Sequence, residues 1–507
     1  MIENLSRRNL ITAAGAAAAA ALAPAAQAAS RLPEKWDEAV DVVVIGAGFA
    51  GLAAAYEAAK AGASVAVLEK MGVAGGNSSI NGGIFAVPCA PEQIALGIKD
   101  SPELMAADML KAGDGMNHAD KVRTLCNEAL PTYWWTVKEL GVQYQQKNIK
   151  QEGGHSVPRS LFTINGSGSE IVSKELAALK KLGVKPRVRT FMEELLLNDD
   201  GRVVGVKIRE GYKFPDRNSG NVKYLAAKKA VVLAYGGFAA DPAFRMIYDP
   251  KLTEKFQSTN QPGATAEAWR AAMAIGAHVI QADQIQILPQ TSPDERGFGI
   301  GFAWSGHVSM FGVWVDASSG RRFVNELANR KVRSLAILDK LNAGHDCLAI
   351  GDAGTAASFA EIRPGMLKRQ LERKCVFEYP TLEALAAAHK VPLDALKATI
   401  DEMNASIETK KDPLGRPVNP KMKPLKDGPW YVARMSPKIH HCMGGLYTNE
   451  KAQVHHVLGH LIPGLYAAGE ATGGVHGAVR LGSCGTADAL IYGRIAGREA
   501  VKEKAWS

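Results

Sequence analysis

Residues 41–70 read DVVVIGAGFAGLAAAYEAAKAGASVAVLEK, a buried strand, a glycine-rich turn, a helix and a second strand in that order. In this pattern Gly46 permits a tight turn, Gly48 lets the backbone approach a pyrophosphate, and Gly51 lets the helix pack on the strand. The second strand ends in Glu69, whose carboxylate can accept hydrogen bonds from ribose hydroxyls. Strand, turn, helix and terminal acid together predict a dinucleotide-binding βαβ unit, in preference to a chance glycine-rich loop.

The composition is typical of a large α/β enzyme. The chain has 507 residues, 47% of them hydrophobic, with 51 glycines, and this length exceeds a single hydrophobic core, so we expect two domains. Lysine and arginine are scattered among 51 acidic residues and leave a net charge of +9. Without a basic run we expect no nucleic-acid partner, whereas a mildly basic surface favours anionic substrates or an acidic redox partner.

The N-terminus has the pattern of an export signal. Arg7 and Arg8 form a twin-arginine pair, an alanine-rich apolar stretch follows, and Ala26-Gln27-Ala28 offers small residues to a signal peptidase. Residues 1–28 are therefore predicted to be a twin-arginine signal peptide that delivers the protein to the periplasm. The alternative, a membrane anchor, needs about 20 strongly apolar residues. The stretch is shorter than this, and no other segment of the sequence approaches a membrane span.

FAD is a better match than NAD because cofactor-type loops lie near both ends of the chain. GGNSSINGG at 75–83 supplies further close-approach glycines, GLYAAGE at 464–470 reads as a strand ending in an acid, and a final helix opens after Arg480. The dipole of that helix can stabilise a reduced, anionic flavin. The residues predicted to bind FAD are Gly46, Ala47, Gly48, Ala50, Gly51, Glu69, Lys70, Gly75, Gly76, Asn77, Ser78, Asn81, Gly82, Gly83, Gly236, Gly237, Gly469, Glu470, Gly482 and Ser483.

With these segments in view, the chain resembles the fumarate reductase/succinate dehydrogenase flavoprotein superfamily. The best match is the soluble periplasmic branch of flavocytochrome c fumarate reductases and related enoate reductases. The motifs GAGxAG, GGNS, GGF, RFVNE, HHxMGG and GLYAAGE-x-TGGVHG-x-x-RLG occur in the same order from about residue 36 to the C-terminus. The resemblance implies an α/β fold with a discontinuous, Rossmann-like FAD-binding domain (36–287 and 440–507) and an inserted α+β capping domain (288–439).

The resemblance also implies which side chains act on a substrate. Arg330 falls on the segment that carries the family's catalytic arginine, and His440 and Arg480 match the pair that binds a substrate carboxylate, with His441 as a second candidate. From the residues alone, a solvated charged face and a structural histidine would be the alternatives. Because the free pKa of arginine is above about 12, Arg330 can donate a proton only beside a carbanion-like centre and if neighbours reprotonate it.

Several positions depart from the family pattern. Leu288 stands where dicarboxylate-reducing relatives have a histidine, Ser305 and Gly306 stand where a Thr-Glu pair is expected, and Ser309 replaces a relay arginine. Together with Leu288, the residues predicted to line the substrate pocket are Trp304, Ser305 and His307. A pocket of this kind should disfavour fumarate and accept an apolar substituent. It also leaves Arg330 without the family's proton path, for which His307 is a candidate substitute.

Other cofactors are not expected. The six cysteines occur singly, without a CxxC pair, which argues against iron–sulfur, zinc-ribbon and c-type haem sites and leaves a disulfide open. His455, His456 and His460 lie in a predicted hairpin, where surface histidines are a better interpretation than a metal site. No histidine lies between Met71 and Pro88, so the family's covalent flavin link is not predicted and FAD should be held non-covalently.

The sequence thus predicts a periplasmic, FAD-dependent reductase of a small α,β-unsaturated monocarboxylic acid, of the methacrylate, acrylate or arylacrylate kind, with a proton from Arg330. The alternatives are a fumarate or urocanate reductase, a flavin dehydrogenase working in the oxidative direction, and an FAD-bearing electron-transfer subunit without a substrate of its own. Since the sequence has no haem motif and no FMN-type domain, a separate donor must deliver electrons. A periplasmic c-type cytochrome or a quinol dehydrogenase would serve.

Overall fold

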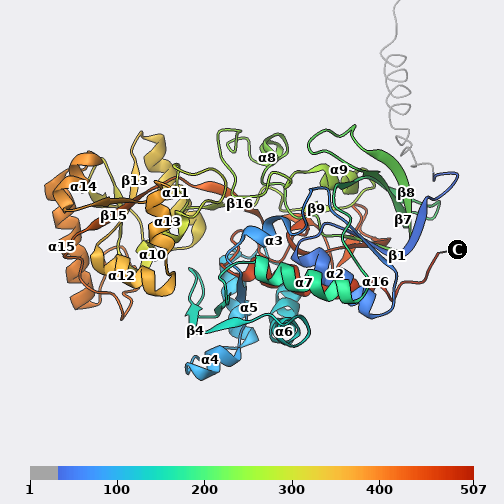
Figure 1. Ribbon diagram of the computed structural model, residues 1–507, viewed down its shortest axis with the longest axis horizontal. Coiled ribbons are helices and arrows are strands. Elements are labelled where there is room, and N and C mark those ends of the chain that lie inside the picture. The colour runs from blue at the N-terminus through green and yellow to red at the C-terminus, as the bar shows by residue number, and fades with distance from the viewer. Residues whose placement is uncertain (1–31, 507) are drawn as a thin grey trace, which may run out of the picture.

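The computed structural model describes residues 32–506, so the predicted signal peptide lies outside the described residues. The chain forms two lobes that lie side by side (Figure 1). We call residues 32–288 and 438–506 the main domain and residues 289–437 the cap. The cap is therefore an insertion within the main domain.

The main domain is built on a seven-stranded sheet of order β18-β19-β8-β1-β2, in which β7 pairs with both β8 and β6. β19, β8, β1 and β2 run parallel. The central positions of β1, Val42, Val43 and Val44, are fully buried, as expected for a parallel strand covered on both faces. The strands are β1 (Glu38–Ile45), β2 (Val65–Leu68), β6 (Thr190–Leu197), β7 (Val203–Glu210), β8 (Asn221–Leu233), β18 (Gln453–His455) and β19 (Leu461–Ala467).

Two helices that meet on this sheet determine where the site forms. α2 (Phe49–Lys60) packs against α16 (Cys484–Ala500), and glycines make the approach close. A Cβ atom at Gly493 would lie 2.4 Å from the carbonyl oxygen of Ala50, and one at Gly497 would lie 2.3 Å from that of Ala54. The N-terminal end of α2 therefore lies against the middle of α16, and the first turns of both helices line one cavity.

The rest of the main domain surrounds this core. A small sheet of order β3-β5-β4 lies beside α5 and α6, with β4 on the side that faces the cap (Figure 1). The remaining elements are α3 (Gly76–Ile80), β3 (Ile84–Ala86), α4 (Pro91–Ala95), α5 (Pro102–Ala112), α6 (Ala119–Trp135), the π-helix η1 (Thr136–Leu140), β4 (Tyr144–Lys150), β5 (Ser160–Thr163), α7 (Ser169–Lys181), α8 (Pro242–Tyr248), α9 (Glu267–Ala274), β9 (Val279–Ile280), β17 (Gly445–Leu446) and the 3-10 helix η2 (Gly469–Ala471).

The cap is an antiparallel five-stranded sheet of order β12-β11-β13-β15-β14 with helices on both faces. Arg322 and Glu326 of the RFVNE motif form a buried ion pair at 2.7 Å, and Arg322 also pairs with Asp412 at 2.7 Å. The motif therefore fixes the loop that leads to Arg330. The cap elements are α10 (Phe302–Phe311), β11 (Val313–Asp316), β12 (Arg321–Arg322), α11 (Arg330–Asn342), β13 (Cys347–Gly351), α12 (Ala353–Ile362), α13 (Met366–Glu372), β14 (Phe377–Tyr379), α14 (Leu382–Ala388), α15 (Leu393–Thr409) and β15 (Trp430–Met435).

Two strands form the passage between the lobes. β10 (Ile285–Leu288) leaves the main domain and β16 (Lys438–Cys442) returns to it, and the two pair antiparallel with Gln286 opposite His441. Between residues 32 and 506 no helix is long and apolar enough to cross a membrane. The same residues contain no group of three or more His, Cys, Asp or Glu side chains placed to hold a metal ion.

Candidate active site

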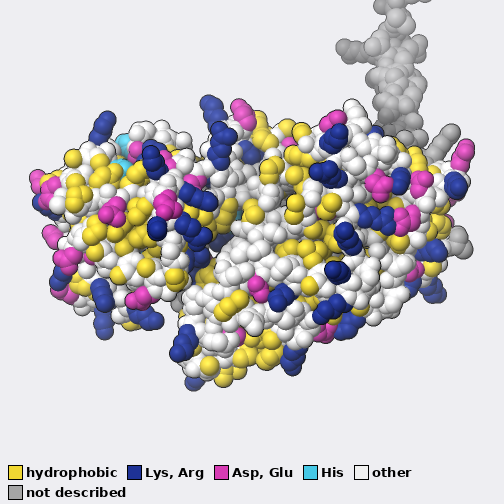
Figure 2. Space-filling model, in the orientation of Figure 1, with side chains coloured by type: hydrophobic (Ala, Val, Ile, Leu, Met, Phe, Trp, Pro, Cys, Tyr) yellow, Lys and Arg dark blue, Asp and Glu magenta, His cyan; other side chains and the backbone are white. Residues whose placement is uncertain are grey.

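A cavity of about 900 Å³ runs from the main domain to the cap and is lined by residues of both. Its volume lies near the upper end of the range of about 300–1,000 Å³ that is usual for ligand sites. The space-filling view shows a hollow between the lobes, with lysine and arginine side chains along the rim on the cap side (Figure 2).

The main-domain end of the cavity is formed by the glycine-rich turn. Gly46 has φ 102°, and a Cβ there would lie 2.4 Å from the carbonyl oxygen of Ala234. Gly48 caps α2 without a side-chain hydrogen bond, so the N–H groups of the first turn other than that of Phe49 remain available to an anion. Glu69 accepts hydrogen bonds from the N–H of Ala47 at 3.1 Å and of Met71 at 2.9 Å.

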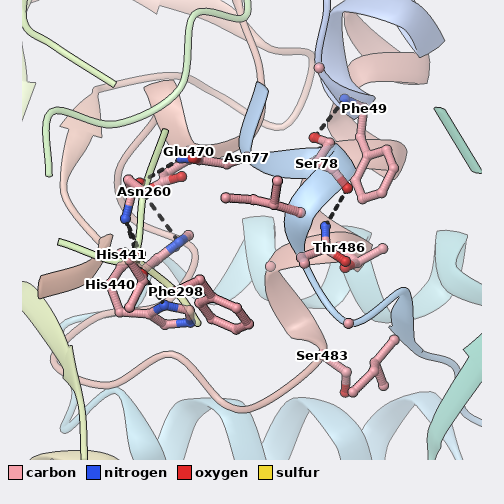
Figure 3. Close-up of a pocket in the computed structure, with 18 of the residues that line it drawn as sticks. Phe49, Asn77, Ser78, Asn260, Phe298, His440, His441, Glu470, Ser483 and Thr486 are labelled. Carbon is pink, nitrogen blue, oxygen red and sulfur yellow. Dashed lines mark hydrogen bonds and ion pairs between the residues drawn. The ribbon is translucent and has the colours of Figure 1, made fainter. Parts of the chain in front are cut away.

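The second glycine-rich loop folds over this turn. Ser78 Oγ accepts a hydrogen bond from the N–H of Phe49 at 3.0 Å, and Asn77 donates to Asn260 at 2.5 Å (Figure 3). Asn81 Oδ1 accepts from the N–H of Gly83 at 2.7 Å. The cavity-lining residues predicted for FAD are Gly46, Ala47, Gly48, Ala50, Glu69, Lys70, Gly75, Gly76, Asn77, Ser78, Asn81, Gly82, Gly236, Glu470 and Ser483. Lys70 faces the cavity with its ammonium already paired to Glu267 at 3.0 Å.

A second helix N-terminus meets the cavity at α16. Ser483 precedes the helix with φ 65° and makes no side-chain cap, while Gly485 and Thr486 of the first turn line the cavity. Glu470 accepts a hydrogen bond from the N–H of Cys442 at 3.0 Å. Desolvation of its carboxyl raises the pKa of Glu470 to about 7.

Five predicted FAD ligands lie behind the cavity wall and support it instead: Gly51, Gly83, Gly237, Gly469 and Gly482. A Cβ at Gly51 would lie 1.9 Å from the carbonyl oxygen of Gly46, and one at Gly237 would lie 2.5 Å from Glu470 Oε1. For Gly51 this is the packing role that the fingerprint predicts. Sequence alone does not distinguish glycines that face a cavity from those that admit a neighbouring backbone.

Near the cap, the side-chain amide of Gln286 is hydrogen-bonded to both Arg330 and Arg480. Arg330 Nη1 donates to Gln286 Oε1 at 3.0 Å, and Gln286 Nε2 donates to the carbonyl oxygen of Arg480 at 2.9 Å. Desolvation, followed by the charge of Arg330, lowers the pKa of Arg480 to about 9. The Arg480 Nε atom has no partner among residues 32–506. Gln286 was not predicted, because a glutamine in a strand carries no signal of its role.

The paired histidines make different contacts, because neighbouring residues of a strand point to opposite faces. Thr259 Oγ1 holds His440 Nδ1 at 2.8 Å, and the His440 ring stacks with Phe298 at 5.8 Å between centroids (Figure 3). Desolvation and then Arg330 and Arg480 lower the pKa of His440 well below its usual value, so the imidazole is neutral. His441 Nδ1 lies 3.4 Å from Glu470, which places it beside one of the predicted FAD ligands.

Two of the predicted substrate-pocket residues line the cavity and two do not. Leu288 and His307 line it. Trp304 is fully buried, where its Nε1 donates to the carbonyl oxygen of Ala349 at 3.3 Å, and Ser305 is fully buried as well. These two predictions were wrong because residues 302–311 are a helix, whose period of 3.6 residues turns Phe302, Ala303, Gly306, His307 and Met310 to the cavity.

The contacts of His307, the candidate substitute in the proton path, are with residues other than Arg330. Its Nε2 lies 2.8 Å from Ser358 Oγ, and no hydrogen bond joins it to Arg330 in the part of the chain that the structure describes. Desolvation, and then the charge of Lys150, lower the pKa of His307 to about 4. The ring is therefore neutral and packs between Phe311 and Phe359.

Comparisons with known proteins agree with this geometry. Residues 41–486 match the FAD binding domain family. The chain is 39% identical to the acrylate reductase flavoprotein subunit of Shewanella woodyi, over 97% of this chain and 98% of that protein. It is 33% identical to the urocanate reductase of Eggerthella lenta, over 94% of this chain and 76% of that protein. Among solved structures, the open conformation of a flavocytochrome c3 fumarate reductase superposes with a TM-score of 0.74 and 29% identity, covering 99% of this chain and 81% of that chain.

The residues present fit FAD. Two helix N-termini without side-chain caps face one cavity, and the backbone around Gly46 leaves no room for a side chain. Glu69 and Glu470 lie where hydroxyl groups of a dinucleotide would be bound. The predicted α/β class and the predicted superfamily are confirmed. The chain belongs to the FAD binding domain family and is an FAD-dependent oxidoreductase.

Proposed function

We propose that the protein reduces the C=C bond of a small α,β-unsaturated monocarboxylic acid that bears an apolar substituent. The observation that carries the proposal is the juxtaposition of the linked arginines Arg330 and Arg480 with a largely apolar wall on the same cavity. The apolar side chains of that wall are Leu288, Phe298, Phe302, Met310, Phe311, Phe359 and Ile362. An anionic head group and a hydrophobic tail would each find a matching surface.

The carboxylate would be bound by Arg480 and His440. The guanidinium of Arg480 can present two N–H bonds to a carboxylate in a planar fork. Thr259 holds His440 at Nδ1, which leaves Nε2 for a second contact to the same group. Binding there draws charge from the conjugated double bond and makes its far carbon more electrophilic.

Arg330 would supply the proton. The hydrogen bond from Nη1 to Gln286 fixes the plane of the Arg330 guanidinium. Its other N–H groups therefore have fixed directions. When bound and reduced, FAD supplies the hydride that such a reduction requires. The chain's own contribution is to hold the carboxylate, exclude water from the apolar side and place the proton donor.

The wall predicts the substrate class. Leu288, which stands where dicarboxylate-reducing relatives have a histidine, is buried, and burial of a second carboxylate against leucine and aromatic rings would cost roughly several kcal/mol. An alkyl or aryl group there would instead gain about 25 cal/mol per Å² of apolar area removed from water. The names of the relatives from Shewanella woodyi and Eggerthella lenta, an acrylate and a urocanate reductase, are in keeping with monocarboxylate substrates.

A steady-state comparison tests the proposal. The purified protein is assayed anaerobically with reduced viologen against acrylate, methacrylate, cinnamate, urocanate and fumarate. We expect kcat/KM for an enoate with an apolar group to exceed that for fumarate by at least about tenfold. Fumarate as the best substrate would overturn the proposed substrate class.

We further propose that the protein works in the periplasm with a separate electron donor. Support comes from the twin-arginine pattern at Arg7 and Arg8 and from the word "subunit" in the name of the Shewanella woodyi relative. The change of both arginines to lysine should leave the flavoprotein in the cytoplasm, as measured by cell fractionation. Continued periplasmic recovery of the double variant would contradict this route.

A further inference from the structure

The turn at residues 151–155 places a carboxylate beside the catalytic cluster. The N–H of His155 donates to the carbonyl oxygen of Glu152 at 3.1 Å, and His155 Nε2 lies 2.9 Å from the carbonyl oxygen of Gly482. A Cβ at Gly482 would lie 2.5 Å from Glu152 Cβ. Glu152 therefore packs directly on the backbone that follows Arg480.

The other side of the same turn contacts the segment that carries Arg330. A Cβ at Gly153 would lie 3.2 Å from the carbonyl oxygen of Ala328 and 3.3 Å from that of Leu327. The turn is thus clamped between the loop that leads into α11 and the loop that leads into α16. The first loop leads directly to Arg330, the first residue of α11, and the second loop contains Arg480.

Glu152 has a route to solvent through Lys150, the last residue of β4. Lys150 Nζ lies 3.0 Å from Glu152 Oε1, and the two side chains are 28% and 14% exposed. Both line the cavity. A proton taken up by Lys150 at the cavity surface can therefore pass inward to the carboxylate.

The positive charges around Glu152 keep its carboxylate ionised. Desolvation alone would raise the pKa of Glu152, but Lys150, Arg330 and Arg333 hold it at about 2. In turn, desolvation lowers the pKa of Arg330 while Glu152 opposes that change. The titratable and charged groups that face Glu152 are Lys150, His155, Arg330, Arg333, Arg363 and Arg480.

An arginine that donates a proton must regain it before the next turnover. The cap positions at which a relay was expected hold Gly306 and Ser309, and the Ser309 hydroxyl donates to the carbonyl oxygen of Gly306 at 2.7 Å. We propose that Lys150 and Glu152, from the main domain, return the proton to Arg330. This inference rests on the proposed function, because it assigns the proton supply of the same site.

The proton transfers form a cycle that returns each side chain to its starting state. An N–H bond of Arg330 breaks as a C–H bond forms at the carbon next to the substrate carboxylate, which leaves a neutral guanidine. A proton leaves the Lys150 ammonium for the Glu152 carboxylate, and the Glu152 carboxyl gives a proton to the guanidine through water in the cavity that both side chains line. Water at the cavity surface then reprotonates the Lys150 amine, so the net reactant is one solvent proton. Lys150 and Glu152 act through Arg330 and do not touch the substrate.

The test compares Glu152→Gln, Glu152→Asp and Glu152→Ala with the parent. Glu361→Gln is the matched control, since Glu361 is a second carboxylate on the cavity wall with no assigned role. For Glu152→Gln we expect kcat to fall by about 100-fold, with a decline that steepens as pH rises because the proton then comes directly from water. Glu152→Asp should retain most of the turnover, added formate should partly rescue Glu152→Ala, and Glu361→Gln should match the parent.

Two readouts besides turnover separate the relay from a structural role. Bound FAD per chain and the Kd for propionate, measured by the change in flavin absorbance, should stay within about twofold of the parent in Glu152→Gln. Turnover of Glu152→Gln within a few-fold of the parent, with a parallel pH profile, would overturn the relay while the proposed function stands. Failure of formate to rescue Glu152→Ala would count against it in the same way. A parent that reduces no enoate would overturn the proposed function and the relay together.

Discussion

Arg330 and Arg480 are two like charges held close together and linked through one glutamine side chain. Desolvation lowers the pKa of both side chains, and the charge of Arg330 lowers that of Arg480 further. Glu152 offsets part of this positive charge. A substrate carboxylate would offset more, so the site is electrostatically complementary to a bound anion.

The pH profile of the reaction should reflect this arrangement. Desolvation brings the pKa of Arg480 down to about 9, so the charged form that binds a carboxylate is present below pH 9 and is lost above it. We expect kcat/KM to fall by about tenfold per pH unit well above pH 9. At saturating substrate, kcat should fall at higher pH, because a bound carboxylate favours the charged guanidinium. A kcat/KM that stays constant to pH 10.5 would contradict the assignment.

Substitution of Arg330 by lysine tests its role. Lysine keeps the positive charge but lacks the planar set of N–H groups that Gln286 holds. We expect kcat to fall by at least about 100-fold while the FAD content stays that of the parent. Arg321→Lys, on the exposed side of the same motif segment, is the control and should leave kcat unchanged. Near-parental turnover of Arg330→Lys would remove Arg330 from the mechanism.

At the scale of single residues, sequence predicted ligands best where chemistry and spacing coincide. Gly46, Gly48 and Glu69 line the cavity, and the fingerprint ties each to a position in strand, turn or helix. Trp304 and Ser305 were misplaced because the helical phase of residues 302–311 was not recognised. Whether a side chain faces a cavity or a core depends on that phase.

At the scale of elements, the contact between α2 and α16 brings two helix N-termini to one cofactor site. Each presents unpaired N–H groups and the positive end of its dipole. The close approach depends on small residues at the contact, since Gly493 and Gly497 face the backbone of Ala50 and Ala54. Packing and cofactor binding are therefore coupled through the same glycines.

Gly51→Ala should disrupt both the packing of α2 and the binding of FAD. A methyl group there would lie 1.9 Å from the carbonyl oxygen of Gly46, so α2 must move away from β1. We expect the free energy of unfolding to fall by about 1–3 kcal/mol, and the FAD content to fall with it. Gly72→Ala, whose added Cβ would meet its nearest neighbour at 3.6 Å, should leave thermal unfolding and FAD content unchanged. Full FAD occupancy in Gly51→Ala would contradict the prediction.

Contacts between elements far apart along the chain could not be predicted from the sequence. The βαβ unit and the final helix follow local patterns, and both were predicted. The antiparallel pairing of β18 with β19 agrees with the predicted hairpin. By contrast, the turn that carries Glu152 lies far along the chain from Arg330, and Gln286 links two arginines 150 residues apart. No local periodicity encodes such meetings, which arise only when the two lobes are assembled.

At the scale of the whole molecule, the cavity encloses a cofactor site contributed by both ends of the main domain. No histidine lies between Met71 and Pro88, so FAD should be held by packing and hydrogen bonds alone. Acid denaturation is expected to release all of the flavin into the supernatant, where its absorbance and chromatographic mobility identify FAD. Flavin that remains with the precipitated polypeptide would contradict the non-covalent assignment.

The paired strands β10 and β16 have a consequence for how the substrate range of this fold can change. Because Leu288 lies opposite Lys438 in their register, the cap leaves and re-enters the main domain at adjacent points. A block of chain inserted between two neighbouring ends can be exchanged as one cassette with little disturbance to the host. The cassette here brings Arg330 and most of the apolar wall, while Arg480, Glu152 and the cofactor loops stay behind. Recombination at this junction would join the same FAD-binding main domain to caps that accept acids with different substituents.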